Sequence, residues 1–187
     1  MIKRELKRKS IHISFGILIL LLINFAGTEI SLHIIGLSLI AGTIISLGIT
    51  RGHNFDIFKN IVEGVERENE KHFPGKAAIF FFISAIVLLI FFKNSPTIVL
   101  AALSVQVFAD SMAAIIGTKY GKHKLLGKKS WEGTLTCLIV SIICINFFFP
   151  LSTAIIVGII ATIVELLPFD DNLWVPLATG AAIRLLL

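Results

Sequence analysis

One stretch of this sequence, residues 108–134, combines a carboxylate in apolar surroundings with a loop rich in lysine and glycine. Asp110 lies inside an apolar segment that runs from about Pro96 to Gly117. A helix over this segment, with a rise of about 1.5 Å per residue, would place Asp110 roughly 10 Å from the helix end. An ionisable side chain at that depth in an apolar helix usually faces a bundle interior and marks a functional site, with a structural ion pair as the alternative.

The residues after this segment form a cationic loop, predicted over 118–130. Residues 117–130 contribute five lysines and three glycines, namely Lys119, Lys122, Lys124, Lys128, Lys129, Gly117, Gly121 and Gly127. Lysines and backbone N–H groups near a helix N-terminus can bind a polyphosphate. The next helix is expected to begin after Ser130, with Glu132 in its first turn, and helix capping alone would also explain both of these residues.

Composition indicates the scaffold that must position these groups. The chain has 187 residues, of which 56% are hydrophobic and only 16% charged, and its mean hydropathy is +0.91. These values exclude an ordinary soluble domain and predict an integral membrane protein with a single domain, 1–187. The net charge of +5 comes from basic residues in the connections between apolar segments. No nucleic-acid-binding motif is present, and membrane topology and phosphate binding explain the basic residues better.

The fold class predicted is all-α, a polytopic bundle of about seven membrane spans. The expected spans are 13–26, 29–50, 74–92, 97–117, 131–149, 151–167 and 173–187. The first imitates a secretory signal, but Ala26-Gly27-Thr28 is a poor cleavage site, so we expect a retained helix. Residues 51–73 are predicted to form an amphipathic cytoplasmic connection. Fifteen of the 17 lysines and arginines fall on one side of this arrangement, together with the N-terminus, and that side is expected to be cytoplasmic.

Two of these spans carry a stripe of small and polar residues that should face other helices. In the fourth span the stripe is Gln106, Asp110, Ala113 and Gly117, and in the sixth it is Gly158, Ala161 and Glu165. Asp171 and Asn172 follow the sixth span in the connection to the last. The predicted topology therefore brings three acids and the lysine loop to the cytoplasmic end of the bundle.

Several other polar residues have two interpretations. Arg8, Lys9 and His12 share one face at the entrance of the first helix, as a positive-inside anchor or as part of a site. Arg67 and Glu70 are three apart, and spacing alone favours a surface ion pair. Arg184 either snorkels to the interface or pairs with a buried acid. Cys137 and Cys144 are too far apart along one helix for a disulfide and are expected to serve as packing residues.

Phosphoryl transfer is the chemistry that this set of residues suits. Carboxylates at the mouth of a membrane bundle can hold Mg²⁺, and lysines can neutralise a nucleotide triphosphate. The nucleotide would arrive from water and the acceptor from the lipid phase, so the reaction centre should lie just below the interface. No P-loop or protein-kinase motif occurs in the sequence, which argues against those mechanisms.

Four segments carry a family resemblance: RKSIH (8–12), ERENE with PG (66–75), FADSMAAIIGTKYGKHK with KKSWEGT (108–134) and VELLPFDDNLWVPL (164–177). Together they resemble the CTP-dependent polyprenol kinase family, which includes dolichol kinase, phytol kinase and yeast-type diacylglycerol kinase. The resemblance covers nearly the whole chain in the same order. Ala109 stands where the family usually has glycine, a change that preserves close packing. The resemblance implies that the γ-phosphate of CTP is transferred to a lipid alcohol with Mg²⁺ or another divalent cation, on the cytoplasmic side.

On this interpretation each group receives a hypothetical role. Asp110, Asp171 and Glu165 are the catalytic and metal-binding acids, and one of the two aspartates accepts the proton of the lipid hydroxyl. Arg8, Lys9 and His12 would close the pocket, and Arg67 and Glu70 would support it. The nucleotide and phosphate set is Lys119, Lys122, Lys128, Lys129, Ser130, Glu132, Gly117, Gly121 and Asn172.

Three alternatives remain open from the sequence. Phosphatidate cytidylyltransferase also uses CTP, a membrane bundle and acidic metal ligands, but forms a CDP-lipid and pyrophosphate. A transporter is less favoured because no inverted repeat stands out and the lysine loop lies outside the membrane. A non-enzymatic scaffold leaves the acids unexplained. The apolar residues do not separate dolichol, a shorter isoprenoid alcohol and diacylglycerol as acceptor, and the small-residue faces are compatible with a homodimer.

Overall fold

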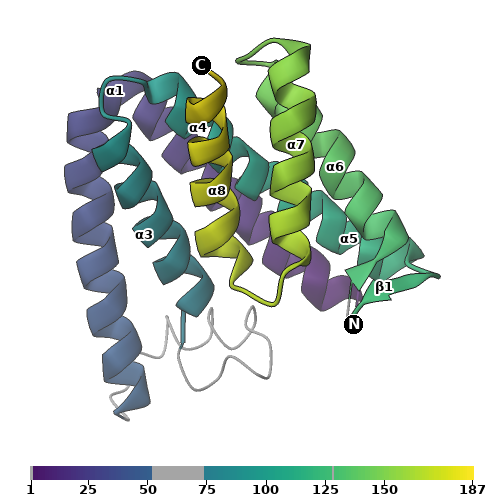
Figure 1. Ribbon diagram of the computed structural model, residues 1–187. Helices are drawn as coiled ribbons and strands as arrows, with labels where there is room; N and C mark the ends of the chain where they lie inside the picture. Colours follow the sequence, from purple (N-terminus) through teal and green to yellow (C-terminus); the bar gives the residue numbers. More distant parts are fainter. Residues whose placement is uncertain (1, 52–73, 128) are drawn as a thin grey trace.

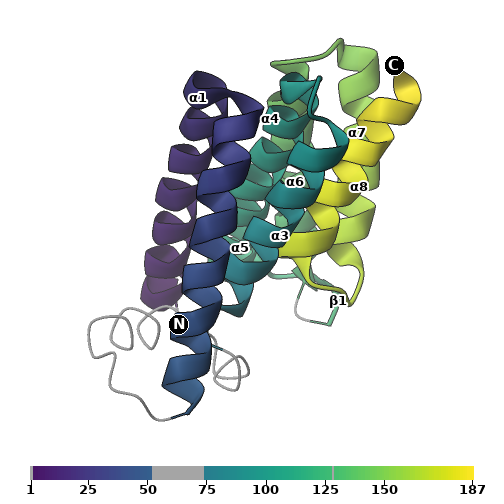
Figure 2. The same cartoon turned by 90° about the vertical axis from the view of Figure 1, so that its left-hand side faces the viewer.

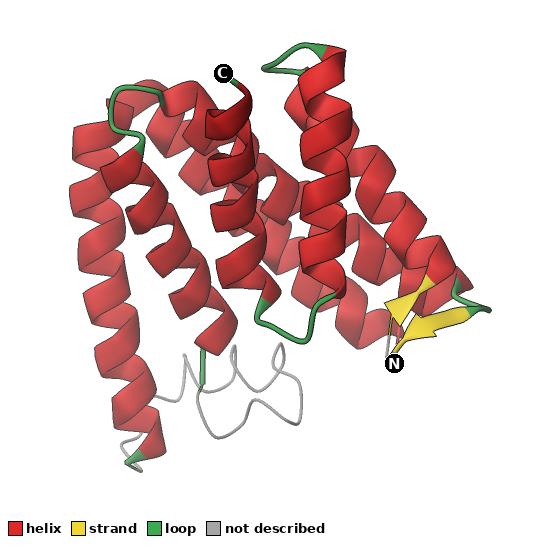
Figure 3. Ribbon diagram, in the orientation of Figure 1, coloured by secondary structure: helices red, strands yellow, loops and turns green. Residues whose placement is uncertain are grey.

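Helices build almost all of the part of the chain that the structure describes, and a small hairpin lies at one end of the helix bundle (Figures 1 and 3). The computed structural model describes residues 2–51, 74–127 and 129–187. The helices are α1 (Ile2–Thr50), α3 (Lys76–Phe91), α4 (Pro96–Ser104), the π-helix η2 (Val105–Ala109), α5 (Asp110–Tyr120), α6 (Trp131–Asn146), α7 (Leu151–Leu166) and α8 (Asp171–Leu186). The strands β1 (Lys124–Leu126) and β2 (Lys129–Ser130) pair antiparallel. The predicted all-helical class is confirmed, and the hairpin is an addition that the sequence analysis did not anticipate.

Helix α1 consists of two limbs that run in opposite directions, side by side (Figure 2). The backbone bends at Gly27, whose φ of 78° and ψ of 174° are not helical. A positive φ strains residues that carry a Cβ, so glycine is the residue suited to this bend. The limbs correspond to the predicted spans 13–26 and 29–50, but the first limb begins at Ile2 and so includes the basic residues of the N-terminus.

A long central helix, 96–120, is formed by α4, η2 and α5 in succession. Its α4 part contacts α1 and α8, and its α5 part contacts α1 and α6. Ala101, Val105 and Ala109 on this helix are fully buried. The predicted inward stripe is confirmed here, since Gln106, Asp110 and Ala113 are also buried.

Two described helices, Ile2–Thr50 and Pro96–Tyr120, are long and apolar enough to cross a membrane. Helices α3, α6 and α7 are apolar but shorter, at 16 residues each, or about 24 Å against roughly 30 Å of hydrocarbon. Large apolar side chains such as Phe25, Phe91 and Phe147 are exposed on the outside of the bundle. These features are consistent with membrane association. The seven spans and the cytoplasmic N-terminus stay predictions.

Two helix boundaries differ from those predicted. Helix α5 continues to Tyr120, three residues beyond the predicted end at Gly117, so Lys119 belongs to the helix rather than to the cationic loop. Helix α8 begins at Asp171, which places Asp171 and Asn172 in its first turn rather than in the preceding connection. The reason is a cap, because the backbone N–H of Asn172 donates to Oδ1 of Asp170 at 3.3 Å. The predicted amphipathic connection falls almost wholly on residues 52–73, outside the described residues.

Helices α5 and α6 cross at a glycine contact beside the hairpin. A Cβ placed on Gly133 would lie 3.0 Å from the carbonyl oxygen of Ala113 and 3.2 Å from Cα of Gly117. Both neighbours are backbone atoms, which cannot turn aside as a flexible side chain can. The absence of a side chain at Gly133 is therefore what lets the two helices approach this closely.

Gly133→Val is accordingly expected to lower the free energy of unfolding by about 1–3 kcal/mol through overpacking. Unfolding of the purified protein by denaturant in detergent micelles would measure it. Gly42→Val is the matched control, because a Cβ at Gly42 meets nothing within 4 Å, and its effect is expected to stay within about 0.5 kcal/mol. Equal losses in the two variants would show that the crossing does not depend on Gly133.

Candidate active site

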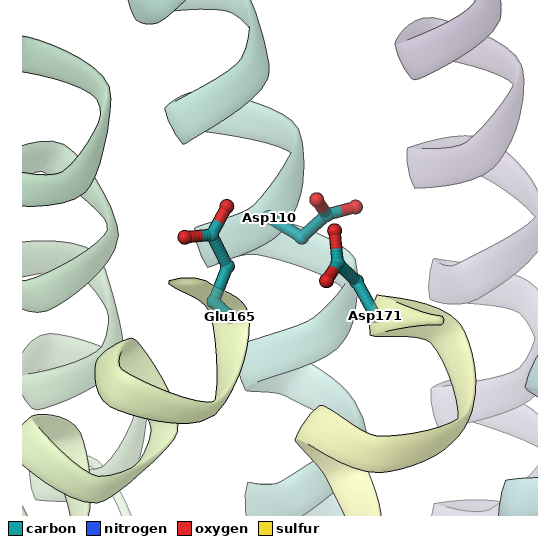
Figure 4. Close-up of side chains that lie close together, drawn as sticks. All are labelled: Asp110, Glu165 and Asp171. Atoms are coloured by element: carbon teal, nitrogen blue, oxygen red, sulfur yellow. The ribbon is translucent and has the colours of Figure 1, made fainter. Parts of the chain in front are cut away.

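Three carboxylates from separate elements meet at the end of the bundle that carries the hairpin. Asp110 is the first residue of α5, Glu165 lies in the last turn of α7, and Asp171 is the first residue of α8. Each offers one oxygen atom, and these oxygens lie within 4.8 Å of one another. Figure 4 shows the three side chains close together, with the carboxylates of Asp110 and Asp171 next to each other and that of Glu165 to one side. The structure thus brings together the three acids that the sequence analysis singled out, and we call them the acidic cluster.

The acidic cluster is largely shielded from solvent. Asp110 is 8% and Glu165 4% exposed, while Asp171 is partly buried. Asp110 directly follows the π-helix, and such wide turns within α-helices are frequent at functional sites. Three carboxylates at this spacing supply the hard oxygen ligands that Mg²⁺ prefers. The donor set therefore fits a divalent cation.

Two lysines from elements far apart in the sequence form ion pairs with the acidic cluster. Nζ of Lys9, on the first limb of α1, forms an ion pair with Asp110. Nζ of Lys129, on β2, pairs with Glu165 and also lies 3.1 Å from Oδ2 of Asp171. Burial by itself lowers the pKa of Lys129, but Asp171 and Glu165 more than offset this effect and raise the pKa above its usual value. Lys129 therefore remains charged at neutral pH.

Gln106 connects the acidic cluster to the start of α8. Its side chain is fully buried, and Nε2 donates to Oδ1 of Asn172 at 3.1 Å and to Oδ2 of Asp110 at 3.5 Å. Asn172 is thereby held by the central helix and by Asp170. Gln106 is a member of the predicted inward stripe, and no functional role was expected for it. Its position four residues before Asp110, one helical turn away, was the signal that could have identified it.

The other two residues predicted from the first helix lie close by but make different contacts. Arg8 pairs with Glu5 at 2.5 Å, within α1. The ring of His12 meets Phe81 edge to face, with 5.7 Å between ring centroids, and its buried Nε2 has no hydrogen-bond partner. Of the three, Lys9 alone has an ion pair with the acidic cluster.

Ser130 and Glu132 shape the hairpin rather than contact the acidic cluster. Ser130 caps α6, with Oγ accepting from the backbone N–H of Gly133 at 3.2 Å. Oε1 of Glu132 accepts hydrogen bonds from the backbone N–H groups of Lys122 at 3.1 Å and of His123 at 3.3 Å. Gly121 lies against Ser130, so that a Cβ on Gly121 would come within 2.7 Å of Ser130 Oγ. The capping interpretation therefore describes Ser130, whereas Glu132 ties the start of the hairpin to the first turn of α6.

The remaining predicted phosphate ligands make no contact with the acidic cluster among the described residues, or lie outside the part of the chain that the structure describes. Lys119 and Lys122 are exposed, and Nζ of Lys119 lies over the ring of Tyr120 at 4.8 Å from its centroid. Gly117 lies at the helix crossing beside Ser130. The predictions for Lys128, Arg67 and Glu70 fall on residues that the structure does not describe. Arg184 is exposed in the last turn of α8, and its snorkelling to a membrane interface stays a prediction. Cys137 and Cys144 are free thiols.

Comparison with known proteins gives relatives for nearly the whole chain. Residues 1–171 match the cytidylyltransferase family. The chain is 27% identical over 201 residues to phytol kinase 1, chloroplastic, of Arabidopsis thaliana, with 95% of this chain and 65% of the relative covered. It is 30% identical to a probable chloroplastic phytol kinase of Triticum aestivum, with 70% and 51% covered. An uncharacterized protein of Methanocaldococcus jannaschii is 29% identical, with 92% and 89% covered. The chain thus spans between half and about two thirds of the two plant proteins. No solved structure matches it.

Proposed function

We propose, from the premise that this chain belongs to the cytidylyltransferase family, that it is a CTP-dependent kinase of an isoprenoid alcohol. The observation that carries the proposal is the meeting of Asp110, Glu165 and Asp171 with two lysines at one end of an apolar bundle. The phytol kinases among its relatives favour an alcohol as the acceptor. The fold and the apolar exterior suit an acceptor that arrives from a membrane.

In the proposed reaction the lipid hydroxyl oxygen forms a bond to the γ-phosphorus of CTP. The bond between that phosphorus and the β–γ bridging oxygen breaks, CDP leaves, and the hydroxyl proton moves to Asp110 or Asp171. Lys129 neutralises charge on the phosphates, and Gln106 keeps Asn172 and Asp110 in place. A divalent cation held by Asp110, Glu165 and Asp171 would supply further neutralisation of phosphate charge. The reaction would take place at the cytoplasmic face of the membrane.

Synthesis of a CDP-lipid is the second candidate, because the family description itself names cytidylyl transfer. In that reaction a phosphate oxygen of phosphatidate forms a bond to the α-phosphorus of CTP and pyrophosphate leaves. The same acids and lysines could serve either reaction, since both displace a phosphate leaving group. The two reactions are therefore distinguished by whether the γ-phosphate of CTP ends in the lipid or in pyrophosphate.

Purified protein incubated with γ-labelled CTP and a panel of lipids provides the test. The panel consists of phytol, a polyprenol, dolichol, diacylglycerol and phosphatidate, with ATP as a competing donor. Label in the lipid from an alcohol supports the kinase, and the best acceptor defines the lipid. Label released as pyrophosphate in the presence of phosphatidate contradicts the kinase and establishes the cytidylyltransferase. No labelled product from any lipid rejects both.

A further inference from the structure

Lys9 and Lys129 hold the acidic cluster in unequal ways. The side chain of Lys9 is 6% exposed and projects from the long helix α1. The side chain of Lys129 is 31% exposed and comes from a two-residue strand at the rim of the bundle. The side chain of Lys129 is therefore the more accessible of the two, and Lys129 is the cation better placed to leave the cluster.

The net charge of the acidic cluster and its two lysines shows why the exposure of Lys129 is important. The three carboxylates carry three negative charges and the two lysines two positive ones, so the described groups leave one negative charge. A divalent cation added beside both lysines would bring three cations into one buried space, where repulsion is weakly screened. With Lys129 withdrawn, a divalent cation and Lys9 balance the three carboxylates. The site is therefore electrically neutral when the divalent cation has replaced Lys129.

Unpaired oxygens give an independent sign that the lysines do not complete the site. Oε2 of Glu165 is buried without a hydrogen-bond partner, although Oε1 of the same carboxylate is paired with Lys129. Oε1 of Gln106, whose Nε2 contacts Asp110, is also buried and unpaired. A buried acceptor without a partner carries the full cost of its lost hydration. These oxygens point to a ligand that the lysine contacts do not replace.

We propose that Lys129 is an exchange cation that couples binding of the divalent cation to binding of the nucleotide. Without nucleotide, Lys129 occupies Glu165 and Asp171 and keeps affinity for a divalent cation low. When the nucleotide binds, its triphosphate attracts the ammonium group of Lys129, and the two carboxylates become available. Lys9 stays on Asp110 throughout. This inference rests on the proposed use of a nucleotide triphosphate and adds the order in which the site fills.

Binding of Mn²⁺ to the nucleotide-free protein tests the proposal without any measurement of activity. Free Mn²⁺ is quantified by electron paramagnetic resonance in a titration of detergent-purified protein. Lys129→Met is expected to bind Mn²⁺ about tenfold more tightly than the wild type, a factor that corresponds to about 1.4 kcal/mol. Lys129→Arg retains the cation and should bind like the wild type. Lys124→Met, which removes an exposed lysine of the same hairpin, is the matched control and should also leave the affinity unchanged.

The double variant Lys129→Met/Glu165→Gln shows where the extra Mn²⁺ binds. Loss of the gained affinity in this variant supports binding at the acidic cluster, and retention of the gain contradicts it. Equal Mn²⁺ affinity in the wild type and Lys129→Met, with both proteins eluting as folded species, overturns the exchange. Should Lys129→Met not fold, Lys129→Gln takes its place with the same expectation. The γ-label assay is separate, so its failure would reject the kinase while the metal titration still reports on Lys129.

Discussion

Asp110→Asn is expected to lower the rate of lipid phosphorylation about a thousandfold or more. The substitution keeps the size of the side chain but removes the charge that, on our proposal, binds the divalent cation or accepts the hydroxyl proton. Loss of such a group removes several kcal/mol of transition-state stabilisation, and each 1.36 kcal/mol is a factor of about ten in rate. The measurement is kcat with CTP and the best lipid alcohol from the panel.

Glu29→Gln is the matched control for this experiment. Glu29 also lies on a helix and pairs with a lysine, Lys93, at 2.7 Å, but its side chain is 70% exposed. Its replacement is expected to leave kcat unchanged. Full activity of Asp110→Asn would remove Asp110 from the reaction, and the kinase mechanism would then have to rest on Glu165 and Asp171.

The second large effect concerns stability, and it arises from the buried pair of Lys9 and Asp110. Lys9→Met leaves a carboxylate without its partner, and Asp110→Asn leaves an ammonium group without its partner. Removing one member of a buried ion pair typically costs about 3–5 kcal/mol, whereas replacing both members by uncharged groups is often nearly neutral. Each single variant should therefore unfold at markedly lower denaturant concentration, and Lys9→Met/Asp110→Asn should recover most of the loss.

Denaturant unfolding of the wild type, the two single variants and the double variant gives the coupling energy directly. Strictly additive losses would mean that Lys9 and Asp110 do not stabilise each other in the folded protein. The same four proteins also separate stability from catalysis, because the double variant is expected to regain stability while its kcat remains as low as that of Asp110→Asn.

The parts of the fold that the sequence predicted were those fixed by long apolar segments. Helices α3, α6 and α7 begin and end close to the expected residues, because turn residues such as Pro96 and Pro150 flank uninterrupted apolar stretches. The bend at Gly27 was expected as a connection between two spans. The hairpin and the extension of α5 to Tyr120 were missed, since local backbone hydrogen bonds decide them and the lysine-rich sequence shows no strand periodicity.

The acids of the candidate site were predictable for a similar reason. Asp110 and Glu165 lie on stripes of small residues, which have to face other helices, so their convergence follows from the helical period. The ion pair between Lys9 and Asp110 joins residues 101 positions apart and depends on how α1 lies against the central helix. The roles of Glu132 and Lys129 likewise depend on the hairpin. Contacts of this kind require the tertiary arrangement and cannot be read from spacing.

The wide turn at Val105–Ala109 has a consequence for how the two halves of the central helix are oriented. One residue in an α-helix corresponds to a rotation of about 100°, so the local widening changes the angular phase between α4 and α5. In this phase α4 faces α8 while α5 faces α6. Deletion of one residue from the turn would turn the segment into an ideal α-helix. Such a helix could keep the contacts of α4 or the direction of the Asp110 carboxylate, but not both. The wide turn thus rotates α5 relative to α4, so that the same continuous helix packs in the core through α4 and directs Asp110 toward the acidic cluster from α5.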